Sequence, residues 1–317
     1  MPSTKERLRP LIAILGPTAT GKSALGIAIA ERFNGEIINC DSTAVYRGFD
    51  IGTDKVPMAE RRGIPHHLID IVDPTDEYTA AQFARDAAAV IADIHGRGKL
   101  PILVGGTGFY YRALTRGLFP GPGKNAELRA RLEGVAARKG VEKLHRMLWH
   151  VDPESATRIQ SRDRKRLIRA LEVYFETGKP LTAHFSDTVS PLPPDVQIGA
   201  IALRMPASWL ADRLAARVDA QFDAGLIDEI RGLLAAGVPA DARPFGGLVY
   251  RQAMDYLNGV RDEAATRKLI AQENRKYARR QLIWFRKEPN LVWFDGPGTN
   301  AEVQDSVIRE LTARDLL

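Results

Sequence analysis

Gly16-Pro17-Thr18-Ala19-Thr20-Gly21-Lys22-Ser23 follows the apolar run from Leu11 to Leu15 and opens a helical pattern that extends to about Phe33. The spacing G-x-x-x-x-G-K-S suits a phosphate cradle. Its glycines let successive backbone N–H groups turn toward one anion, Lys22 reaches the outer phosphate, and the Ser23 hydroxyl can hold Mg²⁺. The positive N-terminal end of the helix adds to this attraction. A ligand-free glycine turn is the alternative, but the strand before it and the helix after it favour a phosphate site.

The sequence on either side alternates between apolar strands and helical stretches. A strand from Glu36 to Cys40 ends at Asp41, and a strand from Pro101 to Val104 is closed by Gly105-Gly106-Thr107-Gly108. Between them we expect a short strand over 67–72 and a helix over 79–95. This alternation predicts an α/β fold with a P-loop NTPase-like parallel sheet, in which Asp41 and Thr107 face the crevice at the carboxyl ends of the strands.

The alternation stops at the Pro- and Gly-rich residues 119–123, after which no strand is evident until Gln197. Helical patterns cover 127–139, 141–149, 153–160 and 164–177. We therefore expect an inserted all-helical domain at 123–194, between core segments 1–122 and 195–317. The second core segment reads as a strand at 197–203, a helix from 208 to 236 broken at Gly225, helices at 245–257 and 263–285, a strand at 291–294 and a terminal helix.

Charge is concentrated in two places. The 317-residue chain has a net charge of +6, and Lys124 to Pro180 alone holds fourteen Lys and Arg against eight Asp and Glu. A second basic cluster lies on the predicted helix at 263–285 and just beyond it. Any one cluster can be a solvated helix face, but two of them in a chain with a phosphate loop favour a polyanionic partner such as nucleic acid.

Other features bear on the compartment. The N-terminal Lys5, Arg7 and Arg9 precede only five apolar residues, and no run of 18 apolar residues occurs, so we expect a cytoplasmic chain without a signal peptide or membrane partner. The single cysteine, Cys40, excludes an internal disulfide framework and a zinc site built on cysteine pairs. We also expect a monomer.

The residues expected in the crevice suit group transfer rather than hydrolysis. The candidate second P-loop strand ends in Gly-Gly-Thr-Gly where ATP-driven motors carry an acidic residue. What remains is Lys22 and Ser23 on a phosphate and its metal, Thr107 as a hydroxyl donor, and Asp41 as a candidate base for the incoming nucleophile. A structural or helix-capping role for Asp41 is the alternative.

Six motifs are spread over nearly the whole chain, and they are Gly16–Ser23, Asp41–Lys55, Pro65–Asp70, Gly105–Leu114, Asp163–Val173 and Tyr277–Arg286. The first motif is generic, and the other five together are highly specific. Through these motifs the chain clearly resembles the bacterial tRNA dimethylallyltransferase (tRNA isopentenyltransferase) family.

The resemblance implies a reaction. The P-loop would hold the diphosphate of dimethylallyl diphosphate with Mg²⁺, and the acceptor would be N6 of adenosine at tRNA position 37, just 3′ of the anticodon. Asp41 would take the amine proton, Thr107 would help place donor and acceptor, and Lys22 with Arg217 or Arg213 would stabilise the leaving diphosphate. The family resemblance implies tRNAs that read UNN codons, and it also implies ATP binding.

The resemblance also implies contacts with the anticodon stem-loop, for which the basic helical insertion is the expected clamp. By motif matching, the tRNA-binding residues would be Asp41, Ser42, Thr43, Ala44, Thr107, Arg129, Lys165, Arg166, Leu167, Ile168, Arg169, Arg279, Arg280, Gln281, Trp284 and Arg286.

Three positions depart from the family pattern, and other functions remain open. Ala44 stands where many members have glutamine, Val249 where glycine is expected, and Ile283 where threonine is expected, which affects base contacts rather than the chemistry. A small-metabolite kinase would share the crevice but would give the basic insertion no purpose. A prenyltransferase of free adenine nucleotides would need no stem-loop clamp. A non-catalytic RNA-binding switch is the third alternative, and Asp41 with Thr107 argues against it.

Overall fold

The computed structural model describes residues 8–317, so Lys5 and Arg7 lie outside the described residues. The strands are β1 Arg9–Leu15, β2 Gly35–Cys40, β3 His66–His67, β4 Leu100–Gly105, β5 Val196–Arg204 and β6 Val292–Asp295. The α-helices are α1 Lys22–Arg32, α2 Ala80–Gly96, α3 Gly108–Arg116, α4 Ala126–Lys139, α5 Val141–Val151, α6 Pro153–Arg158, α7 Arg164–Thr177, α8 Ala207–Asp223, α9 Leu226–Ala235, α10 Leu248–Leu257, α11 Glu263–Phe285 and α12 Ala301–Ala313.

The chain divides into two compact units. Of the described residues, 8–115 and 191–317 form the first unit and 116–190 form the second, whereas 123–194 was expected. The second unit begins earlier because the end of α3 and the loop before α4 belong to it, and not only the helices of the insertion. We call the first the core and the second the helical unit.

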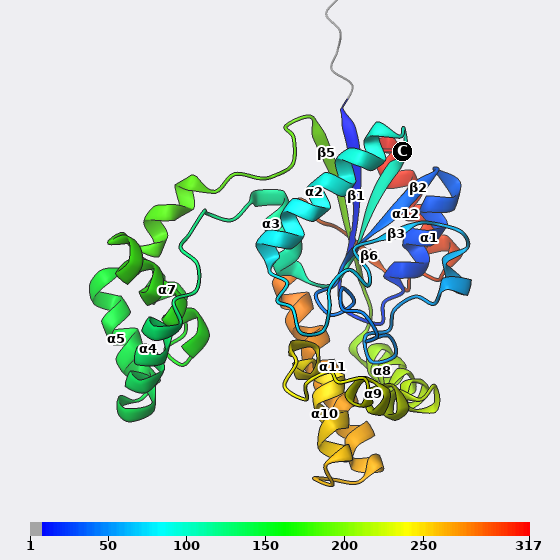
Figure 1. The fold of residues 1–317 in the computed structure, drawn as a ribbon. Helices are drawn as coiled ribbons and strands as arrows, with labels where there is room; N and C mark the ends of the chain where they lie inside the picture. Colours follow the sequence, from blue (N-terminus) through cyan, green and yellow to red (C-terminus); the bar gives the residue numbers. More distant parts are fainter. Residues whose placement is uncertain (1–7) are drawn as a thin grey trace, which may run out of the picture. The chain divides into compact units, whose positions relative to one another are not determined.

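All six strands of the core form one parallel sheet in the order β3-β2-β4-β1-β5-β6. Helices α1 and α12 cover one face, where Ile14, Ile102 and Leu203 meet Leu25 and Leu311 in a single cluster of buried side chains (Figure 1). Helix α2 lies on the opposite face against β2 and β4. Strands β1, β2 and β4 are almost entirely buried, which explains their mainly apolar sequences.

Helices α8 to α11 gather where the strands end (Figure 1). The parallel arrangement brings the loops after β1, β2 and β4 to the same edge of the sheet, under these helices. The core therefore places the P-loop, Asp41 and Thr107 close together, as the sequence predicts.

The expected strand at 67–72 is wrong beyond its first residue. Only His66 and His67 pair with β2. The left-handed backbone of Leu68 and Asp70, with φ of 59° and 56°, ends the strand. The chain then turns to pair with 44–46 instead, where Ile71 donates its N–H to Val45 at 2.9 Å.

The helical unit has its own hydrophobic core. Leu132 of α4, Leu144 and Leu148 of α5, and Leu167 and Leu171 of α7 are buried together. Burying one leucine contributes roughly 1.5–3 kcal/mol, so this cluster accounts for a compact unit of four short helices. Across residues 8–317, none of the helices is long and apolar enough to cross a bilayer.

Candidate active site

The P-loop leaves β1 through a backbone that only glycine adopts easily. Gly16 has a φ of 127°, and a Cβ there would lie 2.7 Å from the carbonyl oxygen of Leu203. Gly21 has a φ of 81° and precedes α1, whose N-terminus receives no hydrogen bond from a capping side chain in the described chain. The first N–H groups of α1 are therefore left to bind an anion.

The side chain of Lys22 is hydrogen-bonded back to the P-loop. Its Nζ donates a hydrogen bond of 2.6 Å to the carbonyl oxygen of Pro17. Burial and the positive charge of Arg217 lower the pKa of Lys22 to about 7, although Asp41 acts in the opposite direction. A bound diphosphate would favour the charged amine, so binding of an anion and protonation of Lys22 should support each other.

Arg217 of α8 reaches the P-loop from the opposite side. Its Nη1 donates to Thr18 Oγ1 at 2.8 Å and to Asp54 Oδ2 at 2.7 Å. Arg213 also lines the cavity, but its guanidinium lies over the ring of Trp209, 5.1 Å from the ring centre. Of the two arginines that the sequence could not separate, Arg217 is the one bonded to the phosphate loop.

Asp41 follows β2, and one of its two oxygens is already engaged. Oδ1 accepts hydrogen bonds from the N–H of Thr43 at 2.8 Å and from its hydroxyl at 2.6 Å. Within residues 8–317, no hydrogen bond is formed to Oδ2 of Asp41. The hydrogen bonds to Oδ1 hold the carboxylate in place, which is a structural role. Oδ2 remains available to accept a proton in the cavity.

Thr107 sits in the turn after β4 and ties that turn to the loop after β2. Its N–H donates to the carbonyl of Cys40 at 3.1 Å, and its hydroxyl oxygen accepts the N–H of Ser42 at 3.1 Å. Gly105 permits this approach, since a Cβ there would lie 2.1 Å from the oxygen of Cys40. Thr107 thus lies next to Asp41 along the edge of the sheet.

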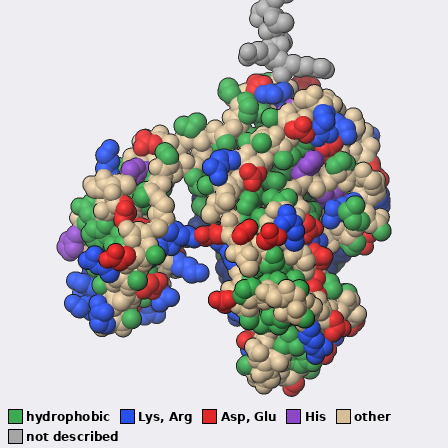
Figure 2. All heavy atoms as spheres, in the orientation of Figure 1, with side chains coloured by type: hydrophobic (Ala, Val, Ile, Leu, Met, Phe, Trp, Pro, Cys, Tyr) green, Lys and Arg blue, Asp and Glu red, His purple; other side chains and the backbone are tan. Residues whose placement is uncertain are grey.

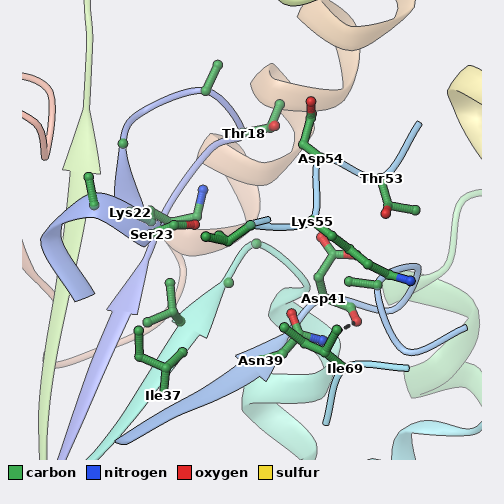
Figure 3. Close-up of a pocket in the computed structure, with 18 of the residues that line it drawn as sticks. Thr18, Lys22, Ser23, Ile37, Asn39, Asp41, Thr53, Asp54, Lys55 and Ile69 are labelled. Atoms are coloured by element: carbon green, nitrogen blue, oxygen red, sulfur yellow. Dashed lines mark hydrogen bonds between the residues drawn. The ribbon is translucent and has the colours of Figure 1, made fainter. Parts of the chain in front are cut away.

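A cavity of about 500 Å³ joins these parts. Lys22, Asp41 and Asp54 come from three different segments and surround the same hollow in Figure 3. Further predicted residues that line it are Thr18, Ala19, Gly21, Ser23, Ala44, Arg213, Arg217 and Gln281. Six predicted residues from the same loops do not line the cavity and instead support the residues that do. They are Gly16, Pro17, Thr20, Ser42, Thr43 and Thr107.

The sequence reasoning missed Asp54 and Tyr277, which both line the cavity. Gln221 Nε2 donates to Asp54 Oδ1 at 3.1 Å, so this carboxylate is held between Gln221 and Arg217. Tyr277 of α11 is partly buried, and burial together with the negative charge of Asp41 raises its pKa. Both residues lie inside quoted family motifs, which was the signal that could have identified them.

The oxygen atoms in the cavity suit a hard cation. The Ser23 hydroxyl stands exposed at the start of α1, and the Asp41 carboxylate lines the same cavity. Residues 8–317 hold no cluster of three or more His, Cys, Asp or Glu able to bind a metal by themselves. This donor set fits Mg²⁺ held mainly by substrate phosphates, the mode that this ion prefers.

The residues of α11 and its C-terminal end that are expected to bind RNA differ in their exposure. Arg279, Arg280 and Arg286 are exposed, whereas Gln281 is 6% exposed. Trp284 is half-buried, with the guanidinium of Arg112 4.4 Å from the centre of its ring. Gln281 therefore does not belong to the exposed side of α11: its side chain points inward and lines the cavity.

The helical unit requires further corrections. Leu167 and Ile168 are 0% and 4% exposed and belong to its hydrophobic cluster, so their side chains cannot contact RNA. Arg129 and Arg169 both bind the buried carboxylate of Glu172, at 2.7 Å each. These donors and burial act in opposite directions, and the pKa of Glu172 falls to about 2.

Lys165 and Arg166 remain as exposed members of the predicted set. Figure 2 shows Lys and Arg side chains gathered at one end of the helical unit. The exposed basic residues of this unit include Arg138, Lys139, Arg146, Arg158, Arg162, Arg164, Lys165 and Arg166.

Together, the parallel sheet, the uncapped P-loop helix and the carboxylate facing it define a P-loop α/β protein equipped for group transfer from a phosphorylated donor. A family model described as IPP transferase matches residues 44–288. The chain belongs to this family.

Known proteins agree with that assignment. The chain is 47% identical to a tRNA dimethylallyltransferase of Solibacter usitatus, over 94% of this chain and 97% of that protein. It is 43% identical to one of Geobacter metallireducens, over 96% and 98%. The solved tRNA isopentenylpyrophosphate transferase of Bacillus halodurans superimposes with a TM-score of 0.71 at 37% identity, covering 97% of each chain. A eukaryotic dimethylallyltransferase acting on tRNA gives a TM-score of 0.77 at 28% identity, covering 97% of this chain and 80% of that one.

Proposed function

We propose that this protein is an enzyme that transfers the dimethylallyl group of dimethylallyl diphosphate to N6 of adenosine at tRNA position 37. The observation that carries the proposal is the single cavity that has a phosphate cradle on one side and the Asp41 carboxylate on the other. Family membership and relatives that act on tRNA support the same substrate pair. tRNAs that read UNN codons are the proposed acceptors, and the chain is proposed to act as a cytoplasmic monomer.

The donor half of the site stabilises the leaving diphosphate. Breaking the bond between C1 of the dimethylallyl group and the diphosphate oxygen leaves the electron pair on that oxygen. The N–H groups of the P-loop, Lys22 and Arg217 face this charge as it develops. Residues 16–23 form the proposed diphosphate site, and Ser23 is the proposed protein ligand of Mg²⁺, which would supply further charge neutralisation to the diphosphate when bound.

The acceptor half removes a proton. The exocyclic amine of adenine is a weak nucleophile, because its lone pair is delocalised into the ring. As the bond forms between N6 and C1, the amine loses one proton, and the free Oδ2 of Asp41 is placed to accept it. The adenine must leave its stack to enter the cavity, which costs a few kcal/mol and costs least in a single-stranded loop.

Two basic surfaces are proposed to bind the RNA. One is the exposed side of α11 with Arg279, Arg280 and Arg286, and the other lies on the helical unit with Lys165 and Arg166. Exposed Lys and Arg side chains suit contacts to phosphate, which position an RNA without reading its sequence. Binding should therefore weaken as salt is raised.

The decisive experiment measures the mass of an unmodified anticodon stem-loop after incubation with Mg²⁺ and dimethylallyl diphosphate. Wild type should add one dimethylallyl group. Asp41→Asn keeps an oxygen that accepts from Thr43 but cannot take up the proton, so its rate should fall by about a hundredfold or more. Both proteins should still bind inorganic diphosphate, which checks that the P-loop is intact in the variant.

Thr43→Val is the matched control, since it removes a hydroxyl that bonds to Asp41 but leaves the carboxylate intact. Its rate should lie within about tenfold of wild type. If wild type leaves the stem-loop unmodified and instead forms ADP from ATP with a small hydroxylated acceptor, the protein is a kinase and the proposal is wrong.

A further inference from the structure

One face of α11 lies directly on the catalytic loops. Tyr277, Gln281, Trp284 and Glu288 follow one another at helical spacing along this face, with Glu288 just past the end of the helix. Tyr277 lines the cavity, and Trp284 packs so closely on α3 that a Cβ at Gly108 would lie 2.2 Å from its ring. Glu288 binds Arg112 of α3. The contacts of this face thus reach both the P-loop cavity and the turn that carries Thr107.

Gln281 makes the central contact. Its Oε1 accepts the N–H of Thr18 in the P-loop at 2.9 Å, and its Nε2 donates to the carbonyl of Gly106 at 2.9 Å. The residue is 6% exposed, and a Cβ at Gly106 would lie 2.3 Å from Nε2. One side-chain amide therefore spans the two loops at close range.

The two partners require an amide at this position. Thr18 presents an N–H and needs an acceptor, while Gly106 presents a carbonyl and needs a donor. Glutamine supplies both in a fixed orientation, whereas an ionised glutamate can only accept and a methionine of similar length can do neither. A buried amide with both groups satisfied is worth more to local order than a solvent-exposed one.

The two loops carry opposite halves of the reaction. Thr18 belongs to the cradle that would hold the leaving diphosphate, and Gly106 precedes Thr107 beside Asp41. The separation of these loops determines how far the donor carbon lies from the acceptor nitrogen. Errors of about 1 Å in such a distance reduce rates by about a hundredfold.

We propose that Gln281 is a positioning residue that fixes the distance between the phosphate loop and the acceptor side of the cavity, and that its side chain is not part of the surface that binds the stem-loop. This inference rests on the proposed function. The RNA-facing role falls instead to its neighbours Arg279 and Arg280, which point to the solvent. Helix α11 then serves two purposes, with a basic outer side and an inner side that aligns the reacting groups.

The test compares Gln281→Met with Arg279→Gln in the full-length chain. At saturating stem-loop and donor, Gln281→Met should lower the single-turnover transfer rate by about tenfold or more. Its Kd for the stem-loop should stay within about twofold of wild type. Arg279→Gln should instead weaken the Kd for the stem-loop and make it less salt-dependent.

Gln281→Glu gives a second readout that a purely structural role would not move. The ionised carboxylate repels the carbonyl of Gly106, whereas its protonated form has an O–H that can donate to it. The ratio of variant to wild-type rate should therefore rise as the pH falls. Lys22, Asp41, Arg217 and Tyr277 face the same cavity in both proteins, so their common effect on the rate cancels in this ratio.

Hydrogen exchange tests the contact without relying on transfer. In Gln281→Met, the backbone amide of Thr18 should exchange about tenfold faster than in wild type, because it has lost its acceptor. Unchanged exchange, or a saturated rate equal to wild type, would overturn the proposal, as would a loss of stem-loop affinity matching that of Arg279→Gln. If wild type itself transfers nothing, the proposed function fails, while faster exchange at Thr18 still supports the contact.

Discussion

Lys22 shows how the protonation of one residue is linked to the binding of an anion. Burial and Arg217 hold its pKa at about 7, so near neutral pH about half of the molecules carry an uncharged amine. A diphosphate on the P-loop would favour the charged amine and raise this pKa. Above pH 7, binding must therefore take up a proton, and below pH 7 the amine is already charged.

We expect the contribution of Lys22 to diphosphate affinity to fall by about tenfold per pH unit above pH 7, until the pKa of the bound state is reached. Calorimetric titration with inorganic diphosphate at pH 8, in buffers of different ionisation enthalpy, measures the protons taken up. Lys22→Met is the control, since it keeps the length of the side chain and removes the titrating group. Equal proton uptake by both proteins would show that Lys22 does not titrate on binding.

For individual residues, the sequence predicts which side chains belong to the site when their positions depend only on neighbouring residues in the chain. The P-loop, Asp41 and Thr107 were found because a strand end and a glycine turn place them without distant partners. The burial of Gln281, Leu167 and Ile168 was not predicted, because a family motif names a continuous run, whereas on a helix only some of its members face outward. Burial distinguishes the inward-facing members of a motif from the outward-facing ones. Burial depends on packing against other parts of the chain, which the motif itself does not describe.

At the scale of elements, the contact between α3 and α11 determines whether the turn at Thr107 is held. Gly108 begins α3, and the ring of Trp284 occupies the space that a side chain there would need. The guanidinium of Arg112 covers the same ring. Any larger residue at position 108 must push the two helices apart.

Gly108→Ala should therefore destabilise the protein by about 1–3 kcal/mol through overpacking. Urea unfolding followed by tryptophan fluorescence measures this loss. Gly232→Ala in α9 is the matched control, because a Cβ there meets nothing within 4 Å and alanine favours a helix interior by roughly 0.5–1 kcal/mol. If both variants gain stability, the helices are not in close contact at Gly108.

Most elements follow from periodicity and breakers in the sequence. The P-loop helix, the four helices of the insertion and the break at Gly225 were predicted within a few residues. Helix α3 was missed, because its short sequence follows a double-glycine turn and contains aromatic and β-branched residues that do not favour a helix locally. Tertiary contacts with α11 stabilise it, and those contacts join residues far apart in the chain.

At the scale of the whole molecule, the chain leaves the core and returns to it through adjacent backbones. A Cβ on Gly117 would lie 1.9 Å from the carbonyl oxygen of Val189, so the first and last parts of the helical unit touch. The unit is an insertion whose two ends are adjacent and which has its own hydrophobic core. It can therefore be exchanged for a short linker without rethreading the sheet.

Replacing residues 116–190 with a short Gly-Ser linker should leave the affinity for inorganic diphosphate within about twofold, because the cavity belongs to the core. Affinity for the stem-loop should fall by about tenfold or more as phosphate contacts are lost. Fluorescence anisotropy at several salt concentrations measures this loss. Retention of full stem-loop affinity by the shortened chain would contradict the assignment of RNA binding to the helical unit.

The partition into two units was largely visible in the sequence, since the strands stop near residue 119 and resume near 197. The boundaries were displaced because proline- and glycine-rich residues mark a change of direction but do not say to which side they pack. Contacts between cavity residues that are far apart in the sequence, such as Arg217 and Thr18, cannot be predicted from local sequence patterns. It arises only when α8 folds against the loop after β1.

The strand order also determines when this protein can become complete during synthesis. Strand β1 lies between β4 and β5 in the sheet, and β5 emerges from the ribosome only after the whole helical unit has been made. The helical unit needs only its own residues for its core, so it can fold while β1 still lacks a neighbour on one side. The nascent core therefore exposes an open apolar edge for the time needed to translate the insertion, and this interval is when chaperone binding is most useful.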